Sequence, residues 1–370
     1  MDRVDIKKFV EGGTAKIDFG ITKKVLIKKK NKEFFFKENE KVEMDLHNDM
    51  AEVLSTYFFK KIGYDNYVDY KMVRIGQDVQ GVISQSYNTK DVVAEKKFAE
   101  ILTLFLYQNK YGNSYYDITK KFTVKQLQKA SAGMDILSVG EYYNSIEFIN
   151  SILISVCFRC GIKLNVDKLE DDLYKNAIID FFMSDGDRHI YNLVFLFKKD
   201  DSGSLYCELA PSFDHGCAFG IRTYWLETSK AMIPQPASFY YPAIGISLKS
   251  QTFSVGDDNF YSNEIFEGGG LFVYELLKHI KKNPKMKELF DKCREVDMEE
   301  VIAEFNKKEP VKIGEQLSEY IVDTFKERLK QVERIEKYME RAEKKKQAAA
   351  LRRKQKKEDE EKQQQMECDL

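Results

Sequence analysis

The sequence predicts an α+β chain of two lobes, a small β-rich N-terminal lobe and a larger, mainly helical C-terminal lobe. Short runs of β-branched and aromatic residues separated by turns dominate residues 1–88. Apolar residues at helical spacing dominate residues 89–308. The remaining residues, 309–370, are rich in charge and predict a C-terminal helix or tail that is partly disordered.

The N-terminal lobe is expected to hold two pairs of strands around one helix. KKVLIKK and KEFFFKE are β-rich runs on either side of a polar turn, and QDVQ separates YKMVRIG from GVISQS. Between the two pairs, DLHNDMAEVLSTYFFKKIGY carries apolar residues at helical spacing, and Gly63 supplies a stop.

The larger lobe is expected to be helical around one hairpin. Three segments have wide apolar faces, and the second of them is apolar nearly all round: VAEKKFAEILTLFLYQN, YYNSIEFINSILISVCFRCG and DKLEDDLYKNAIIDFFM. LVFLF and SLYCELA flank the turn-rich KKDDSG and predict a hairpin. Helices are predicted again for LFVYELLKHIKK, for MKELFDKC and from Ile321 to Met339. Beyond Ala350 the helix either continues as a solvated rod or frays.

Composition excludes several classes of protein. With 59 Lys and Arg against 60 Asp and Glu, the net charge is −1, so a nucleic-acid partner is not expected. No apolar run is long enough for a signal peptide or a membrane span, which makes the cytoplasm the expected location. The six cysteines are interpreted as reduced thiols, and Cys157 and Cys160 as core residues rather than zinc ligands.

The polar residues around the predicted hairpin are the sharpest chemical signal. SDGDRHIYNLVFL, residues 184–196, precedes the hairpin, and FDHG follows it. The spacing lets Asp187 present a carboxylate to a hydroxyl while the amide oxygen of Asn192 reaches a nucleotide-bound metal. Asp214 of FDHG would be a second metal ligand. The alternative is an Asx-rich turn that caps the hairpin, and Asp185 is assigned no role.

Upstream residues supply the other groups that phosphoryl transfer from ATP needs. In EGGTAK, residues 11–16, Gly12 and Gly13 either bring backbone N–H groups close to phosphate oxygens or form an ordinary turn. Lys37 ends the run EFFFK on the face opposite Phe36, where it either reaches solvent or lies in a cleft. Glu52 in the following helix could hold the Lys37 ammonium by a charge-assisted hydrogen bond.

These motifs resemble those of the HipA-like serine/threonine kinases. D-R-H-x-x-N, a hairpin and F-D-H-G, with a strand lysine and a helix glutamate upstream, follow the order of that family. Gly186 to Asn192 is also similar to the G-D-R-H-x-x-N loop of the phosphatidylinositol-kinase branch. Because the chain starts almost directly at the glycine loop, the resemblance is greatest to the short stand-alone members. It implies a bilobal, protein-kinase-like fold.

The resemblance also implies roles for individual residues. Asp187 would be the catalytic base, Asn192 and Asp214 would bind Mg²⁺, and Lys37 would contact the α- and β-phosphates with Glu52 as its partner. The remaining nucleotide-binding positions would be Gly12, Gly13, Thr14, Lys16 and His189. Thr14 is a candidate autophosphorylation site. The expected activity is transfer of the ATP γ-phosphate to a Ser or Thr hydroxyl of a protein, and an antitoxin or regulator is a candidate partner.

Three other functions stay open at the level of sequence. A lipid kinase should offer cations after Asp214, but GCAFGIRTYWLETSKAMIPQP contains only Arg222 and Lys230. A catalytically weak nucleotide-binding protein could use RRKQKK in the tail for docking. A binuclear metallohydrolase usually needs more histidines than the four present, His47, His189, His215 and His279.

Overall fold

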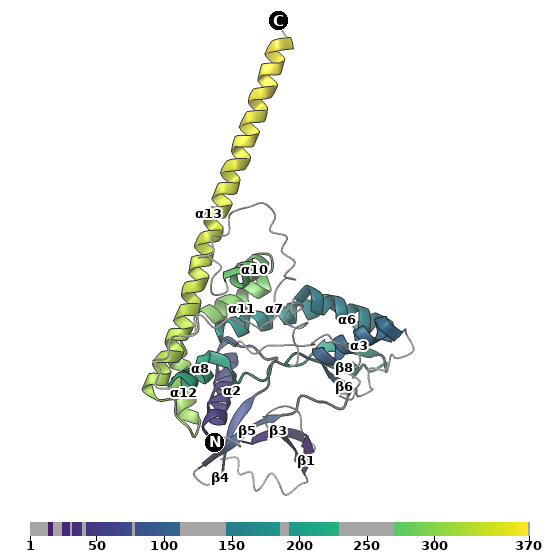
Figure 1. Ribbon diagram of the computed structural model, residues 1–370, viewed down its shortest axis with the longest axis vertical. Helices are drawn as coiled ribbons and strands as arrows, with labels where there is room; N and C mark the ends of the chain where they lie inside the picture. The colour runs from purple at the N-terminus through teal and green to yellow at the C-terminus, as the bar shows by residue number, and fades with distance from the viewer. Residues whose placement is uncertain are drawn as a thin grey trace.

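The computed structural model describes residues 14–17, 24–29, 32–38, 42–75, 78–111, 146–185, 192–228 and 270–368. The strands are β1 (Thr14–Ile17), β2 (Lys24–Lys29), β3 (Lys32–Glu38), β4 (Tyr70–Ile75), β5 (Asp78–Gln85), β6 (Val92–Lys97), β7 (Lys163–Leu164), β8 (Val194–Lys199) and β9 (Leu205–Leu209). The helices are α2 (Val42–Ile62), α3 (Phe98–Tyr111), α6 (Ile146–Cys160), α7 (Val166–Phe182), α8 (Ile221–Thr228), α10 (Gly270–Ile280), α11 (Pro284–Arg294), α12 (Met298–Lys308) and α13 (Glu315–Cys368), with the 3-10 helix η2 (Ala218–Gly220) before α8. The α+β class is confirmed (Figure 1).

The N-terminal strands form a five-stranded antiparallel sheet in the order β1-β2-β3-β5-β4. Ile27, Phe36, Val73 and Ile83 form a small core on one face, whereas Val82 joins the main core of the molecule. Lys37 pairs with Val82 in the register of β3 and β5. Because successive side chains alternate between faces, Lys37 lies opposite Phe36 and faces the main core.

The turn predicted between β4 and β5 is shorter than the sequence indicated. QDVQ was expected to be a turn, but β5 already begins at Asp78, which pairs with Ile75. Asp78, Val79 and Gln80 alternate polar, apolar and polar, a pattern that a strand accommodates as well as a turn does. The prediction of a four-residue turn is therefore wrong.

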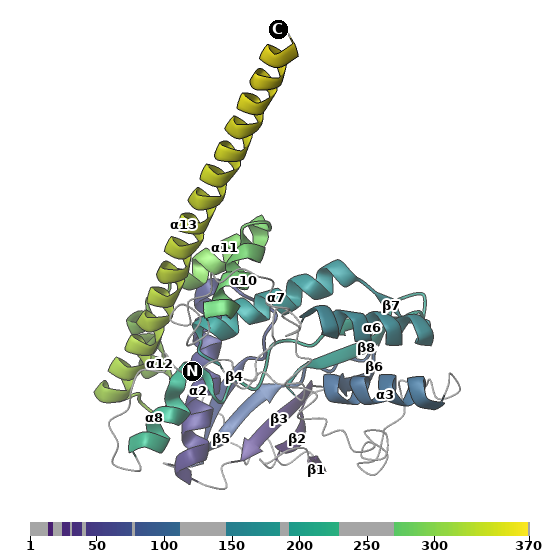
Figure 2. The same cartoon turned by 45° about the horizontal axis from the view of Figure 1, so that its top comes forward.

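Helix α2 lies between the N-terminal sheet and the helical part of the chain (Figure 2). It packs on β4 and β5 on one side and on α8 and α12 on the other. Every residue from Met50 to Phe59 is buried. The helix ends at Gly63, whose φ of 68° favours glycine. The predicted helix is thus confirmed, with its first turn three residues earlier than the segment chosen from sequence.

The predicted hairpin of β8 and β9 is confirmed and belongs to a second sheet, in the order β6-β8-β9-β7. In its turn, Asp200 Oδ1 accepts hydrogen bonds from the backbone N–H groups of Ser202 and Ser204 at 3.0 and 2.9 Å. Residues 93–97 were predicted to begin a helix, but they form β6, which pairs with β8, and α3 starts at Phe98. Ala, Glu and Lys favour helix locally, but backbone pairing with β8 overrides that preference.

The helical part of the chain differs from the prediction in two further respects. The segment of α6 is apolar nearly all round, which predicts burial on every side, yet Ile154 and Phe158 are 43% and 84% exposed. Helices α8 and α12 were not predicted. The sequence of α12 does carry a signal, because Asp297 caps the helix by accepting hydrogen bonds from the N–H groups of Glu299 and Glu300.

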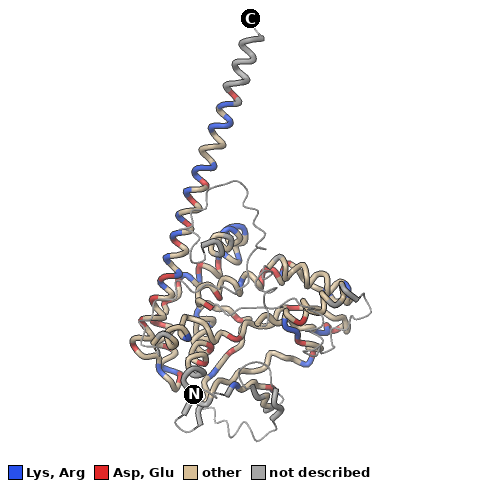
Figure 3. The backbone as a smooth tube through the Cα atoms, in the orientation of Figure 1, with Lys and Arg blue, Asp and Glu red and all other residues tan. Residues whose placement is uncertain are grey.

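Helix α13 has 54 residues and consists of a packed half and a projecting half. The packed half lies against α10 and α12 and buries an apolar stripe that includes Leu317, Ile321, Phe325, Val332 and Ile335. From Glu340 onward every described side chain is exposed. The helix extends away from the body as a rod that carries both signs of charge (Figures 1 and 3). Of the two alternatives left by the sequence, the structure has the continuous helix.

None of the helices in the described segments combines the length and the apolarity that a membrane crossing requires.

Candidate active site

The ammonium group of Lys37 joins side chains from three separate segments. Its Nζ donates a hydrogen bond to Oε1 of Glu52 on α2 at 2.7 Å and lies 4.0 Å from Oδ1 of Asp214, which follows β9. The side chains of Lys37 and Glu52 are 13% and 1% exposed, so water screens their interaction little. The structure therefore brings together three of the residues that the sequence singled out.

The charge of Lys37 is stabilised by these carboxylates. Burial by itself would lower the pKa of Lys37, because desolvation disfavours the ammonium form. Glu52, then Asp214 and then Asp49 act in the opposite direction, and the pKa of Lys37 is raised above its ordinary value. Lys37 is consequently a permanent cation at physiological pH. It can neutralise negative charge but cannot act as a base.

The loop that carries Asp214 is fixed against the segment between α2 and β4. Asp214 has a φ of 60°, a left-handed conformation that Asp adopts more readily than most residues. Its backbone N–H donates to the Tyr70 hydroxyl at 3.4 Å. Two residues earlier, the backbone of Ser212 exchanges hydrogen bonds with Asn66 and Val68 at 2.9 and 2.8 Å. These contacts hold the Asp214 carboxylate on the side of the sheet where Lys37 lies.

The β8–β9 hairpin places Asn192 at the same end of the second sheet as Asp214. Phe195 pairs with Leu209, and the N–H of Ala210 donates to the carbonyl of Val194 at 2.9 Å. The chain just before β8 thus lies beside the chain just after β9. Asn192 is 8% exposed there. The hairpin thus brings the segments that carry Asn192 and Asp214 to the same end of the sheet.

The oxygen donors at this place fit a magnesium ion, which prefers carboxylate and amide oxygens. Asp214 offers a carboxylate whose side chain is 29% exposed. Asn48, one turn before Glu52 on α2, has a buried amide oxygen that accepts no hydrogen bond from any described residue. A Cβ atom at Gly216 would lie 3.4 Å from Cβ of Asn48, so this oxygen adjoins the Asp214 loop. A buried acceptor without a donor is a place for a ligand or for water around a cation.

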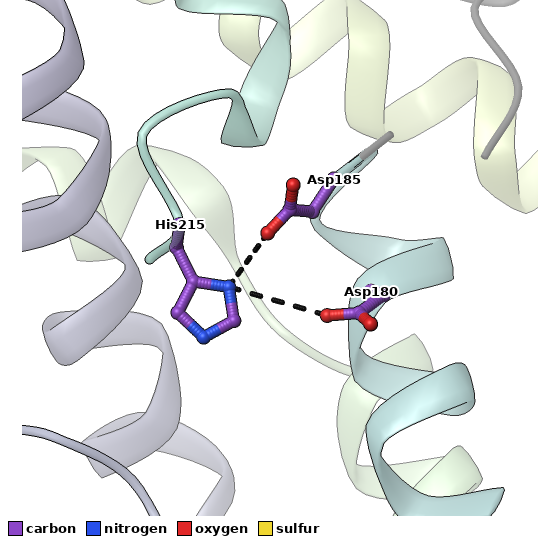
Figure 4. Close-up of side chains that lie close together, drawn as sticks. All are labelled: Asp180, Asp185 and His215. Atoms are coloured by element: carbon purple, nitrogen blue, oxygen red, sulfur yellow. Dashed lines mark hydrogen bonds and ion pairs between the residues drawn. The ribbon is translucent and has the colours of Figure 1, made fainter. Parts of the chain in front are cut away.

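A second polar cluster, formed by Asp180, Asp185 and His215, was missed at the level of sequence (Figure 4). Nδ1 of His215 is 2.7 Å from Oδ2 of Asp185 and 4.0 Å from Oδ1 of Asp180. All three side chains are buried. The sequence gives Asp185 the appearance of a loop residue and Asp180 that of the polar position of a helix. Only the positions of Asp185 and His215 in the two polar motifs hinted at a contact.

This cluster is better explained by hydrogen bonding than by metal binding. The Asp185 carboxylate can only accept, so Nδ1 of His215 carries the proton, and Nε2 lies 3.1 Å from the Ser212 hydroxyl. Both ring nitrogens are therefore engaged. Among the described residues no other group of three such side chains is arranged to hold an ion, so these residues lend no support to a binuclear metallohydrolase site.

Helix α13 supports the start of the loop that follows α7. Arg328 is 1% exposed, and its Nε donates to the hydroxyl of Ser184 at 2.8 Å. Its guanidinium also donates to Gln331 and lies 5.4 Å from the centre of the Phe181 ring. A buried guanidinium satisfied in this way fixes Ser184, the residue before Asp185.

Only some of the other predicted site residues lie in the described part of the chain. Gly12, Gly13, Asp187 and His189 lie outside the described residues. Thr14 and Lys16 belong to β1, at the edge of the N-terminal sheet, where they pair with Ile27 and Val25 of β2.

Comparison with known proteins gives structural likenesses alone. No protein-family model and no curated protein sequence matches the chain. Among solved structures, the chain is similar to the Helicobacter pylori proinflammatory kinase CtkA, with 12% identity, 90% of this chain and 99% of that chain covered, and a TM-score of 0.48. It is also similar to a chain of the Shewanella oneidensis toxin–antitoxin complex of HipA, HipB and operator DNA, with 12% identity, 88% and 66% covered, and a TM-score of 0.37. With TM-scores below 0.5, neither likeness carries a conclusion about function.

Proposed function

We propose that the chain is an ATP- and Mg²⁺-dependent kinase of the HipA-like type that transfers the γ-phosphate to a protein hydroxyl. The observation that carries the proposal is the Lys37 ammonium, held by Glu52 at 2.7 Å and facing Asp214 at 4.0 Å. A strand lysine, a helix glutamate and a loop aspartate in this relation form the electrostatic half of a phosphoryl-transfer site.

Each residue has a defined task in the proposed reaction. Lys37 binds phosphate oxygens, and Glu52 orients its ammonium so that the charge is already in place when the nucleotide enters. Asp214 and Asn192 would hold the Mg²⁺ ion, which when bound supplies further positive charge to the phosphates. Asp187 accepts the proton of the attacking hydroxyl.

A protein hydroxyl is the proposed acceptor. A lipid head group that carries phosphates would need cations near the metal-binding loop. Between Gly216 and Thr228, the stretch that contains η2 and α8, Arg222 is the only Lys or Arg. The surface after Asp214 is therefore poorly suited to an anionic head group.

The test is phosphate transfer from γ-labelled ATP, with mass spectrometry to locate the phosphate. We expect the wild-type chain to become labelled or to label a protein substrate. Asp187→Asn and Asp214→Asn should each reduce transfer by about 100-fold or more, because the proton acceptor or a metal ligand is lost. The thermal melt of both variants should stay close to that of the wild type, since both changes preserve side-chain volume.

Asp291→Asn is the matched control, because Asp291 forms an exposed ion pair with Lys287 on α11, outside the sheet, helix and loops that carry these groups. Transfer by Asp291→Asn should equal that of the wild type. Transfer near the wild-type level by Asp214→Asn would remove the basis of the proposal. Nucleotide binding without any transfer would instead identify a non-catalytic nucleotide-binding protein.

A further inference from the structure

We propose that His215 is a positioning residue that ties the loop leading to Asp187 to the loop carrying Asp214. This inference rests on the proposed kinase function, in which these two aspartates are the base and a metal ligand. Nothing in the sequence motifs assigns His215 this task. The task follows from its contacts in the structure (Figure 4).

His215 bridges two segments that are thirty residues apart in the chain. Nδ1 donates to the Asp185 carboxylate at 2.7 Å, at the end of α7. Nε2 lies 3.1 Å from the Ser212 hydroxyl, within its own loop. One ring nitrogen therefore binds the residue just after α7, and the other binds within the loop that carries Asp214. Because Nδ1 and Nε2 point in different directions from the ring, rotation of the ring would break both hydrogen bonds.

The bridge is enclosed, which strengthens it. His215 and Asp185 are each 1% exposed, and Ser212 is 3% exposed. The Phe59 ring of α2 packs against the imidazole in a T-shaped arrangement, with 5.2 Å between ring centres. Water cannot replace these hydrogen bonds, and in such surroundings a polar contact is stronger and more directional than at the surface.

The ends of the bridge lie next to the reacting groups in the chain. Asp185 precedes Asp187 by two residues, and His215 directly follows Asp214. The backbone on both sides is held as well: the Asp185 N–H donates to the Asp180 carbonyl at 2.8 Å, and the Phe219 N–H donates to the Met183 carbonyl. A shift of about 1 Å between reacting groups can cost on the order of 100-fold in rate. A contact at these positions therefore bears on the rate of transfer and not only on folding.

The competing interpretation is that His215 is an ordinary buried histidine that stabilises the core. Both interpretations predict a lower melting temperature when the ring is replaced. They differ in what happens to the folded enzyme, because only a positioning residue changes kcat while the affinity for nucleotide stays nearly constant. The experiment therefore measures the two separately.

Three replacements separate the hydrogen bonds from the packing. His215→Phe keeps the ring and removes both bonds. His215→Asn keeps an N–H close to the Nδ1 position, and His215→Gln extends toward the Nε2 position. We expect kcat to fall by about 10- to 100-fold in His215→Phe, as for groups that orient metal ligands. The Kd for ATP without Mg²⁺ should change by less than about threefold. His215→Asn should recover more activity than His215→Gln.

A second measurement does not depend on catalysis. Hydrogen exchange of the backbone amides of Asp185 and Asp214 should become faster in His215→Phe, because each loop loses its link to the other. His279→Phe is the matched control: it replaces another ring-packed histidine, on α10, and should leave both amides unchanged. If the wild-type chain transfers no phosphate, the kinase proposal fails, and the exchange data still decide whether His215 couples the loops.

Two results would overturn the inference. One is a folded His215→Phe variant with wild-type kcat. The other is exchange at Asp185 and Asp214 that is as slow as in the wild type. Should His215→Phe fail to fold, equal kcat and equal exchange in the Asn and Gln variants would contradict it in the same way.

Discussion

At the scale of single residues, the unusual backbone conformations gather around the candidate active site. Within the described segments, the non-glycine residues with positive φ are Ser184, Asp214 and Phe219. Each such conformation costs on the order of 1–2 kcal/mol and persists only where neighbours hold it. Arg328 holds Ser184, Tyr70 holds Asp214, and the Met183 carbonyl holds Phe219. Hydrogen bonds from neighbouring segments thus hold the backbone at these three positions.

Sequence reasoning found polar residues whose type and spacing point to a chemical role, such as Lys37 and Glu52. It missed the buried contact between Asp185 and His215. Alternation along β3 predicted that Lys37 lies opposite Phe36, and Glu52 of the following helix was named as its partner; the structure shows this contact at 2.7 Å. The burial of Asp185 could not be predicted, since polarity alone does not distinguish an exposed loop aspartate from one that is 1% exposed. The roles of Asp187, Asn192 and Asp214 stay predictions until transfer is measured.

His279 should make the stability of the protein depend on pH. Its ring stacks on Tyr174 with 3.4 Å between ring centres, and its buried Nε2 has no hydrogen-bond partner among the described residues. Burial, which outweighs the nearby Asp171 carboxylate and is assisted by Lys282, lowers the pKa of His279 below 6.5. As pH falls below about 6.5, the unfolded chain takes up the proton first, so the free energy of unfolding decreases.

This contribution is present above pH 6.5 and is lost as the pH falls through the lower pKa of the folded state. His279→Phe should therefore flatten the acid side of the stability curve. Urea unfolding of the variant and of the wild type at pH 8 and at pH 5.5 measures this loss of stability. The value at pH 8 is the reference, because His279 is neutral there in the folded and in the unfolded chain. An identical decrease in the variant and the wild type would exclude His279 as the cause.

At the scale of elements, amphipathic patterns predicted most helices and strands, and strand pairing explains the strands β6 and β7 that they missed. The hairpin of β8 and β9 was predicted because its turn carries Asp, Ser and Gly. Strand β6 was not, because VVAEKK has the composition of a helix and becomes a strand only beside β8. Pairing with a strand that is distant in sequence cannot be read from the spacing of apolar residues within the segment itself. The same limit applies to β7, two residues that pair with β9.

The placement of Lys37 depends on Gly81, where strand β5 approaches the backbone of β3 closely. It has a φ of 145°, and a Cβ there would lie 1.9 Å from the backbone oxygen of Lys37. Gly81→Ala should force β3 and β5 apart, with a loss of more than about 1 kcal/mol in the free energy of unfolding. It should also reduce phosphate transfer, because the Lys37 strand moves away from Glu52. Urea unfolding and the transfer assay measure the two effects.

Gly203→Ala is the control for backbone strain alone. Gly203 also has a positive φ, 81°, but a Cβ there would meet no atom within 4 Å, and the turn between β8 and β9 that holds it is remote from Lys37. This variant should lose stability and keep its transfer activity. Equal transfer by the Gly81 and Gly203 variants would contradict the link between the ladder and the site.

At the scale of the whole molecule, one core unites the sheet and the helices. Buried residues of α2, α7, α12 and the packed half of α13 belong to the same cluster, together with Met72 and Val82 of the N-terminal sheet. Hydrophobic periodicity predicted the buried faces of α2, α7 and the packed half of α13 but not that of α12, and it did not predict which faces meet. Which faces pack together depends on the crossing angles of the helices and on the shapes of their side chains, and neither can be read from local sequence.

Removing the end of α13 should leave this core intact. The side chains described beyond Lys346 are exposed, and surface changes away from a core usually shift stability by less than about 0.5 kcal/mol. A chain that ends after Lys346 should melt within about 2 °C of the full-length protein and transfer phosphate equally well. Calorimetry of both chains measures this. A melt lowered by several degrees would show that the projecting half contributes to folding.

The rod formed by α13 has a consequence for how the protein moves in solution. With 54 residues, the helix is about 80 Å long, whereas a compact chain of 370 residues has a radius of gyration of about 21 Å. Friction on the rod slows diffusion and makes tumbling anisotropic. A monomer will consequently elute from a sizing column as if it were a heavier particle, and light scattering is the appropriate measure of its mass.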